Sequence, residues 1–331
     1  MALNGCSNKT IETKFVSIEN QKFIDAEGNQ LILHGINYVN KGAKIDKENF
    51  SNPENFKLMK KWGFNCIRLG VIWAGVEPQP GKYDETYLKD IDYQIQLAAA
   101  NNMYVFLDMH QDLYSQLFSD GAPQWATLTE GNEHISNSPV WSDAYFTSPA
   151  VKTAITNFWN NKEVENNIGI QDRYIAMWKM LAERYKENST VIGFDLMNEP
   201  NIGWGNIKGQ ELMIGTFIES FANKTGTELS GEEVVEKWLS PDGRSEILDF
   251  LSDPVIYASV VDAQYPIYSV FEKEQLMPFF EKTIKAIREV NIEHLIFLET
   301  SMSSNMGVYT AIDRIIDEDK LVYAPHGYDL V

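Results

Sequence analysis

The 331-residue sequence has few basic residues for its size. Lys and Arg total 28 against 47 Asp and Glu, which gives a formal net charge of −19. Nucleic-acid binders, and proteins held electrostatically on anionic membranes, need clusters of Lys and Arg. We therefore expect no nucleic-acid partner, and a neutral or cationic small substrate is easier to reconcile with this charge.

Cysteine is also scarce, and the two that are present exclude a disulfide framework and a four-cysteine zinc site. Cys66 lies in an apolar run, which predicts a buried thiol. The residues before Cys6 read Leu-Asn-Gly and are similar to a bacterial lipoprotein processing box, followed by a polar stretch that could act as a tether. We expect a flexible segment over residues 1–20, either the remnant of a lipoprotein signal with a lipid anchor at Cys6 or a plain terminus with a free thiol.

Long apolar runs are absent as well. No run approaches the roughly 20 residues that a membrane-spanning helix needs, so we expect no transmembrane segment. An extracellular or bacterial cell-envelope location is the prediction that accompanies the possible lipoprotein signal. The 44% hydrophobic content is enough to fill a sizeable core, which excludes global disorder.

Predicted strands and helices alternate along the chain, which is typical of a mostly parallel sheet. A hairpin around residues 27–29 comes first. The predicted strands follow at residues 31–39, 65–73, 103–110, 191–198, 294–299 and 321–324, the first of them buried. The predicted helices span residues 52–62, 84–101, 171–185, 279–290 and, more briefly, 308–316.

Two long stretches, 111–170 and 201–270, follow the third and fourth predicted strands. The first reads as irregular and the second has some helical pattern. Long loops at the carboxyl ends of strands are typical of a (β/α)8 TIM barrel, here with about six of its eight units over residues 21–331. A doubly wound sheet is the competing fold, but no glycine-rich phosphate loop follows the first strand.

Polar residues end several of the predicted strands, and in a barrel they converge on one face. The sharpest case is Glu199, preceded by Asn198 and followed by Pro200. Burial of such a carboxyl suits a general acid, whereas the structural alternative is a glutamate that caps the next helix. Each of the others also has a structural reading, as an ion-pair partner, a core histidine or a packing tyrosine; they are Arg68, His110, Asp112, Glu299, His326 and Tyr328.

Taken in order, these motifs resemble glycoside hydrolase family 5, a group of retaining β-glycosidases on TIM barrels. The resemblance runs from about residue 23 to the end. It is carried by Leu-His-Gly-Ile-Asn at 33–37, Asn-Cys-Ile-Arg at 65–68, Asp-Met-His at 108–110, Leu-Met-Asn-Glu-Pro at 196–200 and His-Gly-Tyr at 326–328. Lys41, the His-Gln-Asp at 110–112, the Gly-Ala-Pro-Gln-Trp at 121–125 and the Asn-Phe-Trp at 157–159 are similar to the endoglycoceramidase branch, which releases an intact glycan from ceramide.

The resemblance implies a mechanism with two carboxylates about 5–5.5 Å apart. Glu199 would be the general acid/base. The family's nucleophile follows its seventh strand, so we expect it beyond Val331 and expect this chain to be inactive as it stands; Glu299 is the less favoured alternative. By analogy, the substrate-binding or positioning residues would be Lys41, Arg68, His110, Asp112, Trp159, Asn198, His326 and Tyr328. Met213, Ile214 and Phe217 could receive lipid or simply pack on the barrel.

The predicted function is therefore hydrolysis of the glycan–ceramide linkage of glycosphingolipids. The alternatives are another family 5 β-glycanase of polysaccharide catabolism, a glycosylceramidase, or a catalytically inactive carbohydrate-binding surface lipoprotein. No metal or organic cofactor is implied, because catalysis by two carboxylates needs none.

Overall fold

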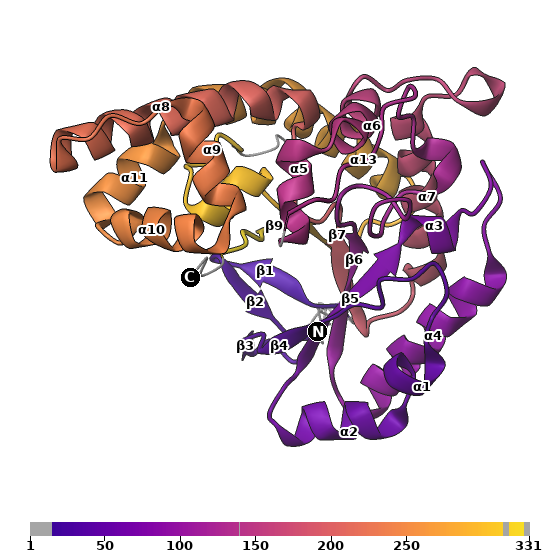
Figure 1. Ribbon diagram of the computed structural model, residues 1–331. Coiled ribbons are helices and arrows are strands. Elements are labelled where there is room, and N and C mark those ends of the chain that lie inside the picture. The colour runs from indigo at the N-terminus through magenta and orange to yellow at the C-terminus, as the bar shows by residue number, and fades with distance from the viewer. Residues whose placement is uncertain (1–14, 139, 314–317, 328–331) are drawn as a thin grey trace, which may run out of the picture.

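The computed structural model describes residues 15–138, 140–313 and 318–327. Its centre is a six-stranded parallel sheet in which the strands lie side by side in chain order (Figure 1). These strands are β4 (Gly35–Tyr38), β5 (Cys66–Ile72), β6 (Tyr104–His110), β7 (Val191–Asp195), β8 (Leu295–Leu298) and β9 (Leu321–Tyr323). A doubly wound sheet reverses its strand order at a switch point, whereas this order never reverses, as a partial TIM barrel requires.

Four helices connect neighbouring strands of the sheet. Their N-termini are set by the sequence: Asn52 caps the first of them ahead of a proline, and Asp84 accepts the backbone N–H groups of Thr86 and Tyr87 at the start of the second. The four are α2 (Pro53–Lys61), α4 (Glu85–Ala100), α7 (Ile170–Tyr185) and α13 (Met277–Arg288), and the short α1 (Lys47–Phe50) and α3 (Trp73–Val76) also lie in this part. Strand and helix positions thus agree with the predicted alternation.

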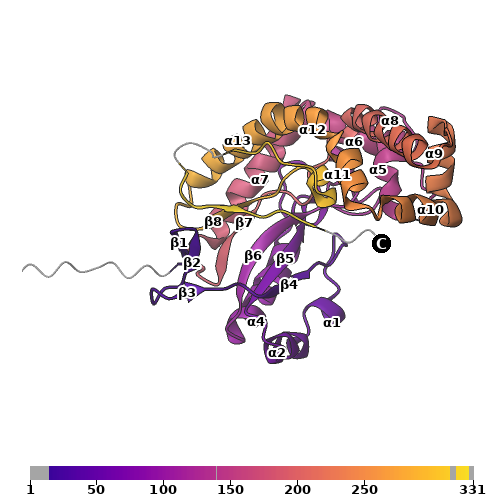
Figure 2. The ribbon, with the colours of Figure 1, turned by 90° about the vertical axis from the view of Figure 1, so that its left-hand side faces the viewer.

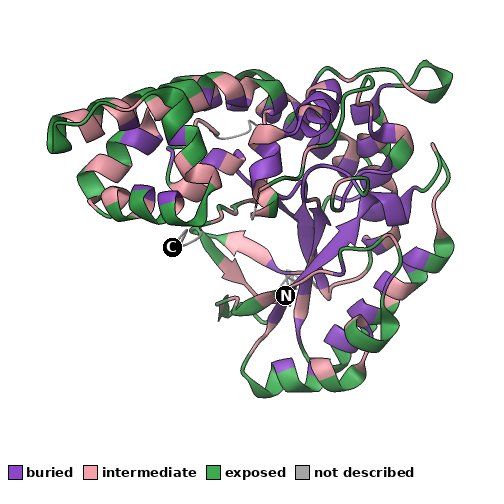
Figure 3. Ribbon diagram, in the orientation of Figure 1, coloured by how far each residue is buried: buried purple, intermediate pink, exposed green. Residues whose placement is uncertain are grey.

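The core lies along the middle of the sheet, where every residue of β5, β7 and β8 is buried (Figure 3). The Cys66 thiol is buried as predicted, and burial raises its pKa to about 12. The prediction of a buried first strand is wrong, because β4 is a partly exposed edge strand. A separate three-stranded antiparallel sheet precedes β4 in the chain and contains the predicted hairpin. Its strands are β1 (Ser17–Glu19), β2 (Lys22–Ile24) and β3 (Gln30–Leu31).

The first long insertion, between β6 and α7, is more regular than predicted. It contains α6 (Pro149–Trp159), which Ser148 caps, as well as the short elements η1 (Gln124–Ala126), η2 (Trp141–Asp143), α5 (Ala144–Thr147) and η3 (Glu165–Asn167). The apolar residues Val151, Ile155 and Phe158 recur at helical spacing on the buried side of α6. The sequence alone therefore contains the helical signal of α6.

The second insertion forms a helical layer beside the barrel (Figure 2). It has a small hydrophobic core of its own, built around Phe217, Val234, Ile247 and Val260. Its elements are η4 (Gly203–Gly205), α8 (Asn206–Thr225), α9 (Gly231–Leu239), α10 (Pro241–Leu251), α11 (Pro254–Asp262), α12 (Tyr265–Phe271) and the π-helix η5 (Glu272–Leu276). Among the described residues, no helix is both long and apolar enough to span a bilayer.

Two details of the later chain differ from prediction. The described part of the predicted helix at 308–316 is not helical, and a 3-10 helix, η6 (Met302–Met306), precedes it instead. Phe217 is buried in the insertion's core, so it is not free to receive lipid. Met213 packs partly buried against the same core, and Ile214 also borders a surface groove with Ile218 and Val235.

Candidate active site

Arg68 lies at the centre of a buried ion cluster inside the sheet. Its guanidinium reaches from β5 to Asp108 on β6 at 2.7 Å, to Asp195 on β7 at 2.8 Å and to Glu299 after β8 at 2.5 Å. Asp108 and Asp195 face each other in register on neighbouring strands, which brings both carboxyls to the same depth. Burial opposes the charge on Arg68, but these three acids outweigh it and raise the pKa of Arg68 above its ordinary value.

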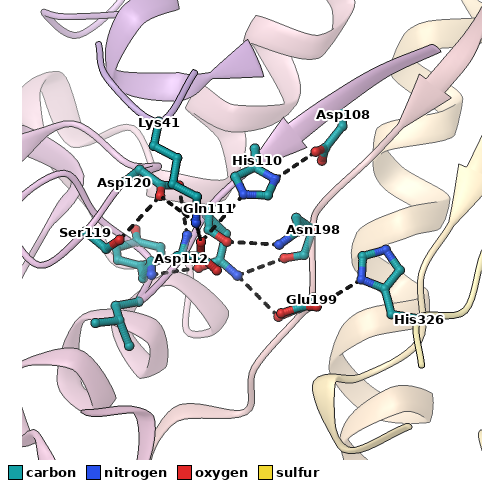
Figure 4. A network of polar contacts seen from close by, with 12 residues as sticks. Lys41, Asp108, His110, Gln111, Asp112, Ser119, Asp120, Asn198, Glu199 and His326 are labelled. Carbon is teal, nitrogen blue, oxygen red and sulfur yellow. Dashed lines mark hydrogen bonds and ion pairs between the residues drawn. The ribbon is translucent and has the colours of Figure 1, made fainter. Parts of the chain in front are cut away.

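A second cluster follows β6, at the end of the strand (Figure 4). The His110 Nδ1 lies 2.8 Å from an Asp108 oxygen, and its Nε2 lies 3.6 Å from Asp112, a charge contact rather than a hydrogen bond. Lys41, reaching over from the loop after β4, donates to Asp112 and lies 3.9 Å from Asp120. Burial alone would lower the pKa of His110, but Asp108 and Asp112 raise it to about 10, so the ring is an imidazolium at neutral pH.

Glu199 follows β7 in a left-handed backbone conformation with φ 46°. A residue with a Cβ pays of order 1–3 kcal/mol for such a conformation, and it persists only where neighbours hold it. Here the Glu199 N–H donates to Glu299 Oε2 at 2.7 Å, and Gln111 Nε2 donates to the Glu199 carbonyl at 3.2 Å. The backbone is therefore fixed from both neighbouring strands.

The side chain of Glu199 is held as well. Asn305, in η6 after β8, donates its amide to Glu199 Oε1 at 2.9 Å. His326 Nδ1 lies 2.9 Å from the same oxygen (Figure 4). The other nitrogen of His326 lies 3.0 Å from Glu299 Oε1, so one imidazole bridges the two glutamates. Although burial opposes its charge, Glu199 and Glu299 raise the pKa of His326 to about 10.

Acidic side chains outnumber basic ones across the two clusters. The carboxyls are Asp108, Asp112, Asp120, Asp195, Glu199 and Glu299, and the cations are Lys41, Arg68, His110 and His326. Burial, with Glu299 and Asp108 nearby, raises the pKa of Asp195 well above its usual range despite the contact with Arg68. Burial also raises the pKa of Asp120 to about 6.

Residues 24–331 match the family Cellulase (glycosyl hydrolase family 5). The chain belongs to this family. The match covers almost the whole sequence, so the parallel sheet is the greater part of a family 5 (β/α)8 barrel.

Among curated relatives, the chain is 34% identical over 218 residues to an endoglycoceramidase of Cyanea nozakii, a match that covers 57% of this chain and 42% of that protein. It is 25% identical to a glucosylceramidase of Aspergillus fumigatus over 94% of this chain and 56% of the relative. A structure of endo-glycoceramidase II from Rhodococcus sp. superposes with a TM-score of 0.66 at 25% identity, over 93% of this chain and 58% of that one. The family 5 chain thus spans about half the length of the relatives it matches.

The family 5 sheet brings together most of the residues predicted from the sequence. Lys41, Asp112 and His110 form one contiguous group, and Arg68, Glu299 and His326 form a second that meets it at Asp108. Asn198 lies between them, accepting from Arg68 Nη2 at 3.1 Å and donating to the Gln111 carbonyl at 3.1 Å. Tyr328, Cys6 and a nucleophile beyond Val331 all lie outside the described residues.

Trp159 is placed differently from the prediction. Its indole N–H donates to the Asn201 carbonyl at 2.6 Å, and its rings are buried against Phe158, Phe271 and Phe279. The cavity that it shares with His110 measures about 30 Å³, far below the roughly 300 Å³ of a small ligand pocket. Trp159 therefore belongs to the core, and its predicted role as a sugar-stacking platform is not supported. Trp125 is also a packing residue, in edge contact with Trp73.

Several residues of the site were not predicted. Trp141 is 51% exposed, with the Lys41 ammonium 5.4 Å from its ring centre, so an open aromatic face borders the Lys41 group. Gln111 and Asn305 hold Glu199, and Asp120 completes the Lys41 group. Of these, Gln111 and Asp120 lie close to predicted residues in the chain, whereas nothing in the local sequence marks Asn305.

Proposed function

We propose that this family 5 chain is the catalytic domain of a β-glycosidase that cleaves glycosphingolipids between glycan and ceramide with retention of configuration. The observation that carries the proposal is the setting of Glu199. Its carboxyl follows a buried strand in a fixed left-handed turn, with Asn305 and His326 on one oxygen. The endoglycoceramidase relatives support the choice of substrate.

Glu199 is assigned as the general acid/base. It would protonate the leaving ceramide oxygen and later remove a proton from the attacking water. Because His326 is an imidazolium near neutral pH, it can stabilise the carboxylate of Glu199 after the proton is given up. Lys41, His110 and Asp112 would hold the hydroxyls of the first sugar, since they offer donors and an acceptor beside the same strand ends.

Glu299 is assigned as a positioning residue rather than the nucleophile. Its Oε1 is shared by Arg68 and His326, and its Oε2 accepts the backbone N–H of Glu199. A nucleophilic carboxylate needs an oxygen directed at the anomeric carbon, and both oxygens of Glu299 are engaged within the protein. We assign no nucleophile among the described residues.

The test is turnover of a fluorescent lactosylceramide by the gene-length protein. Release of intact lactose is expected, with the β-anomer formed first in the NMR spectrum. Glu199→Gln should abolish release and keep substrate binding, and Glu187→Gln, at a distant surface glutamate, is the matched control. Cleavage of only cello-oligosaccharides or mannans would refute the substrate assignment, and unchanged turnover in Glu199→Gln would refute the acid/base role.

A second candidate function is hydrolysis of simple glycosylceramides. The alignment over 94% of the chain with the Aspergillus glucosylceramidase favours it. The two candidates differ in the product. Release of glucose from glucosylceramide, without release of lactose from lactosylceramide, would select the second. Saturable glycan binding without any turnover would instead support the inactive lipoprotein, for which the predicted envelope location and Cys6 anchor remain predictions.

A further inference from the structure

A polar groove of about 560 Å³ lies on the outer side of α6, away from the catalytic clusters. The two sides of α6 border different spaces. Ile155, Phe158 and Trp159 face the small cavity that His110 lines. The opposite side carries four polar residues at helical spacing, and all four line the groove; they are Thr153, Thr156, Asn157 and Asn160. One helix thus separates the groove from the small cavity beside His110.

Trp204 provides an aromatic wall of this groove, and the protein fixes it there. Its indole N–H donates to Thr153 Oγ1 at 2.9 Å, and its backbone N–H donates to Thr156 Oγ1 at 3.0 Å. The Lys152 ammonium lies 4.5 Å from the ring centre on one face. The indole is nevertheless 39% exposed, so the open surface lies on the remaining face and edge of the ring.

Gly203 allows this close approach of the turn to α6. Its φ is 68°, in the left-handed region, and a Cβ added there would lie 2.5 Å from Thr156 Oγ1 and 2.8 Å from the Lys152 carbonyl. Only glycine fits, because any other side chain would push Trp204 away from the helix. The exposed indole is therefore held by the backbone as well as by its own hydrogen bonds.

The other walls are cross-linked but keep open hydrogen-bonding groups. Asn132 donates to Thr153 Oγ1 at 3.1 Å, and Asn157 donates to the Leu128 carbonyl at 2.7 Å. Among the described residues, no hydrogen bond engages the side chain of Asn160 or the amide oxygens of Asn132 and Asn157. All three side chains remain available to a ligand, and the bonds that Asn132 and Asn157 donate fix those two amides in advance.

The chemistry of the lining selects the class of ligand. Lys162 and Glu130, at the groove's edge, neutralise each other by direct contact, so the groove offers no net charge to an ion. Seven of the eight lining side chains are polar and the eighth is Trp204, which does not suit an acyl chain. A pyranose combines an apolar C–H face with a rim of hydroxyls, which matches an open indole beside fixed amides.

We propose that this groove is a second glycan-binding site, separate from the catalytic clusters, that takes a neutral oligosaccharide with one pyranose ring stacked on Trp204. Its argument uses the groove alone, so it stands apart from the proposed hydrolysis. A site of this kind would hold a sugar chain on the protein surface while another part of the substrate occupies the catalytic clusters.

The experiment is an NMR titration of the chain carrying ¹⁵N-labelled tryptophan with lactose and, separately, cellotetraose. The indole signal of Trp204 is identified by its disappearance in Trp204→Phe. With at least one of the two sugars, that signal should shift saturably. The same shift is expected in Lys41→Ala, a variant that removes the half-exposed cation of the catalytic group and leaves the groove untouched. Binding to the groove, followed in the Lys41→Ala background by calorimetry, should weaken about tenfold in Trp204→Ala and be restored in part by Trp204→Phe, which keeps an aromatic face.

Asn160→Ala, which removes an exposed amide without touching the core, should weaken the same binding, whereas Trp62→Ala, at an exposed tryptophan after α2, should leave it unchanged. A Trp204 signal that stays fixed with both probes would overturn the proposal, whether or not other indole signals move. A shift that vanishes in Lys41→Ala would also overturn it, because the site would then be the catalytic one. Hydrolysis is measured separately, so its failure leaves this result intact.

Discussion

Removal of the Arg68 charge is expected to destabilise the protein strongly. Arg68 is buried and, within the part of the chain that the structure describes, supplies the only direct cation to Asp195, while it also contacts Asp108 and Glu299. Taking away one partner of a buried ion pair typically costs about 3–5 kcal/mol, because the other charge is left buried and unpaired. Arg68→Met, which keeps an apolar stem of similar length, should therefore lower the free energy of unfolding by about 4 kcal/mol.

The cost should depend on pH in a defined direction. Without the guanidinium, Asp195 loses the charge that favours its ionised form, so its pKa in the folded state, already raised by burial, rises further above that of the unfolded chain. An acid with a raised pKa destabilises the fold at high pH, and protonation relieves the cost as pH falls through the folded pKa. Arg68→Met should therefore be less destabilising at pH 5 than at pH 8.

The measurement is urea unfolding, followed by tryptophan fluorescence and circular dichroism at both pH values. Arg184→Met is the matched control, because Arg184 also contacts two acids, Glu85 at 2.9 Å and Asp92 at 2.6 Å, but at a more exposed surface site. Its removal should cost about 1 kcal/mol or less. Equal losses in the two variants, or a larger loss for Arg68→Met at pH 5 than at pH 8, would refute the reasoning.

Three further perturbations test other parts of the site. Glu272 is buried and accepts hydrogen bonds from four donors in the segment after β8, so Glu272→Gln should lower the free energy of unfolding, measured in thermal melts, by about 2 kcal/mol. A loss no greater than that of Glu274→Gln, at an exposed position, would contradict this. Asn305→Ala should reduce turnover about tenfold with little change in substrate binding, since it frees the carboxyl of Glu199 from one fixed donor; a change in binding alone would argue against positioning. The raised pKa values of His110 and His326 predict stability that is complete below about pH 6.5 and lost as pH rises toward 10, so a chemical-denaturation midpoint that is flat over this range would exclude the two imidazolium bridges.

The barrel was predictable because its signal is local. Each buried strand is a short apolar run, and a polar residue such as His110 or Glu199 lies at the end of its strand or a few residues beyond it. Parallel strands bring those ends to one edge, so position in the chain translates into position in space. The edge strand β4 was misjudged because its apolar residues resemble those of a central strand, and only the pairing order reveals its exposure.

The insertions were less predictable because burial decides the role of their aromatic residues. Trp141, Trp159 and Trp204 all lie in loops or short helices after strand ends, yet the second is buried and the other two are open. For Trp159 the spacing from Ile155 favours a helical core position, and that local signal was outweighed by the resemblance. For Trp204 the decisive contacts come from α6, about fifty residues earlier, which no local pattern encodes.

The acid/base residue itself depends on contacts of the same long-range kind. Four side chains fix Glu199, and they lie at separations of 88, 100, 106 and 127 residues along the chain; they are Gln111, Glu299, Asn305 and His326. The strained turn of Glu199 can therefore form only once β6, β8 and β9 have joined the sheet, because its partners follow those strands. The short motif around Glu199 supplies the carboxyl group, whereas the order of the strands in the barrel determines which side chains surround it. Substitutions far from Glu199 that loosen the loop after β8 should consequently affect turnover before they affect the sheet.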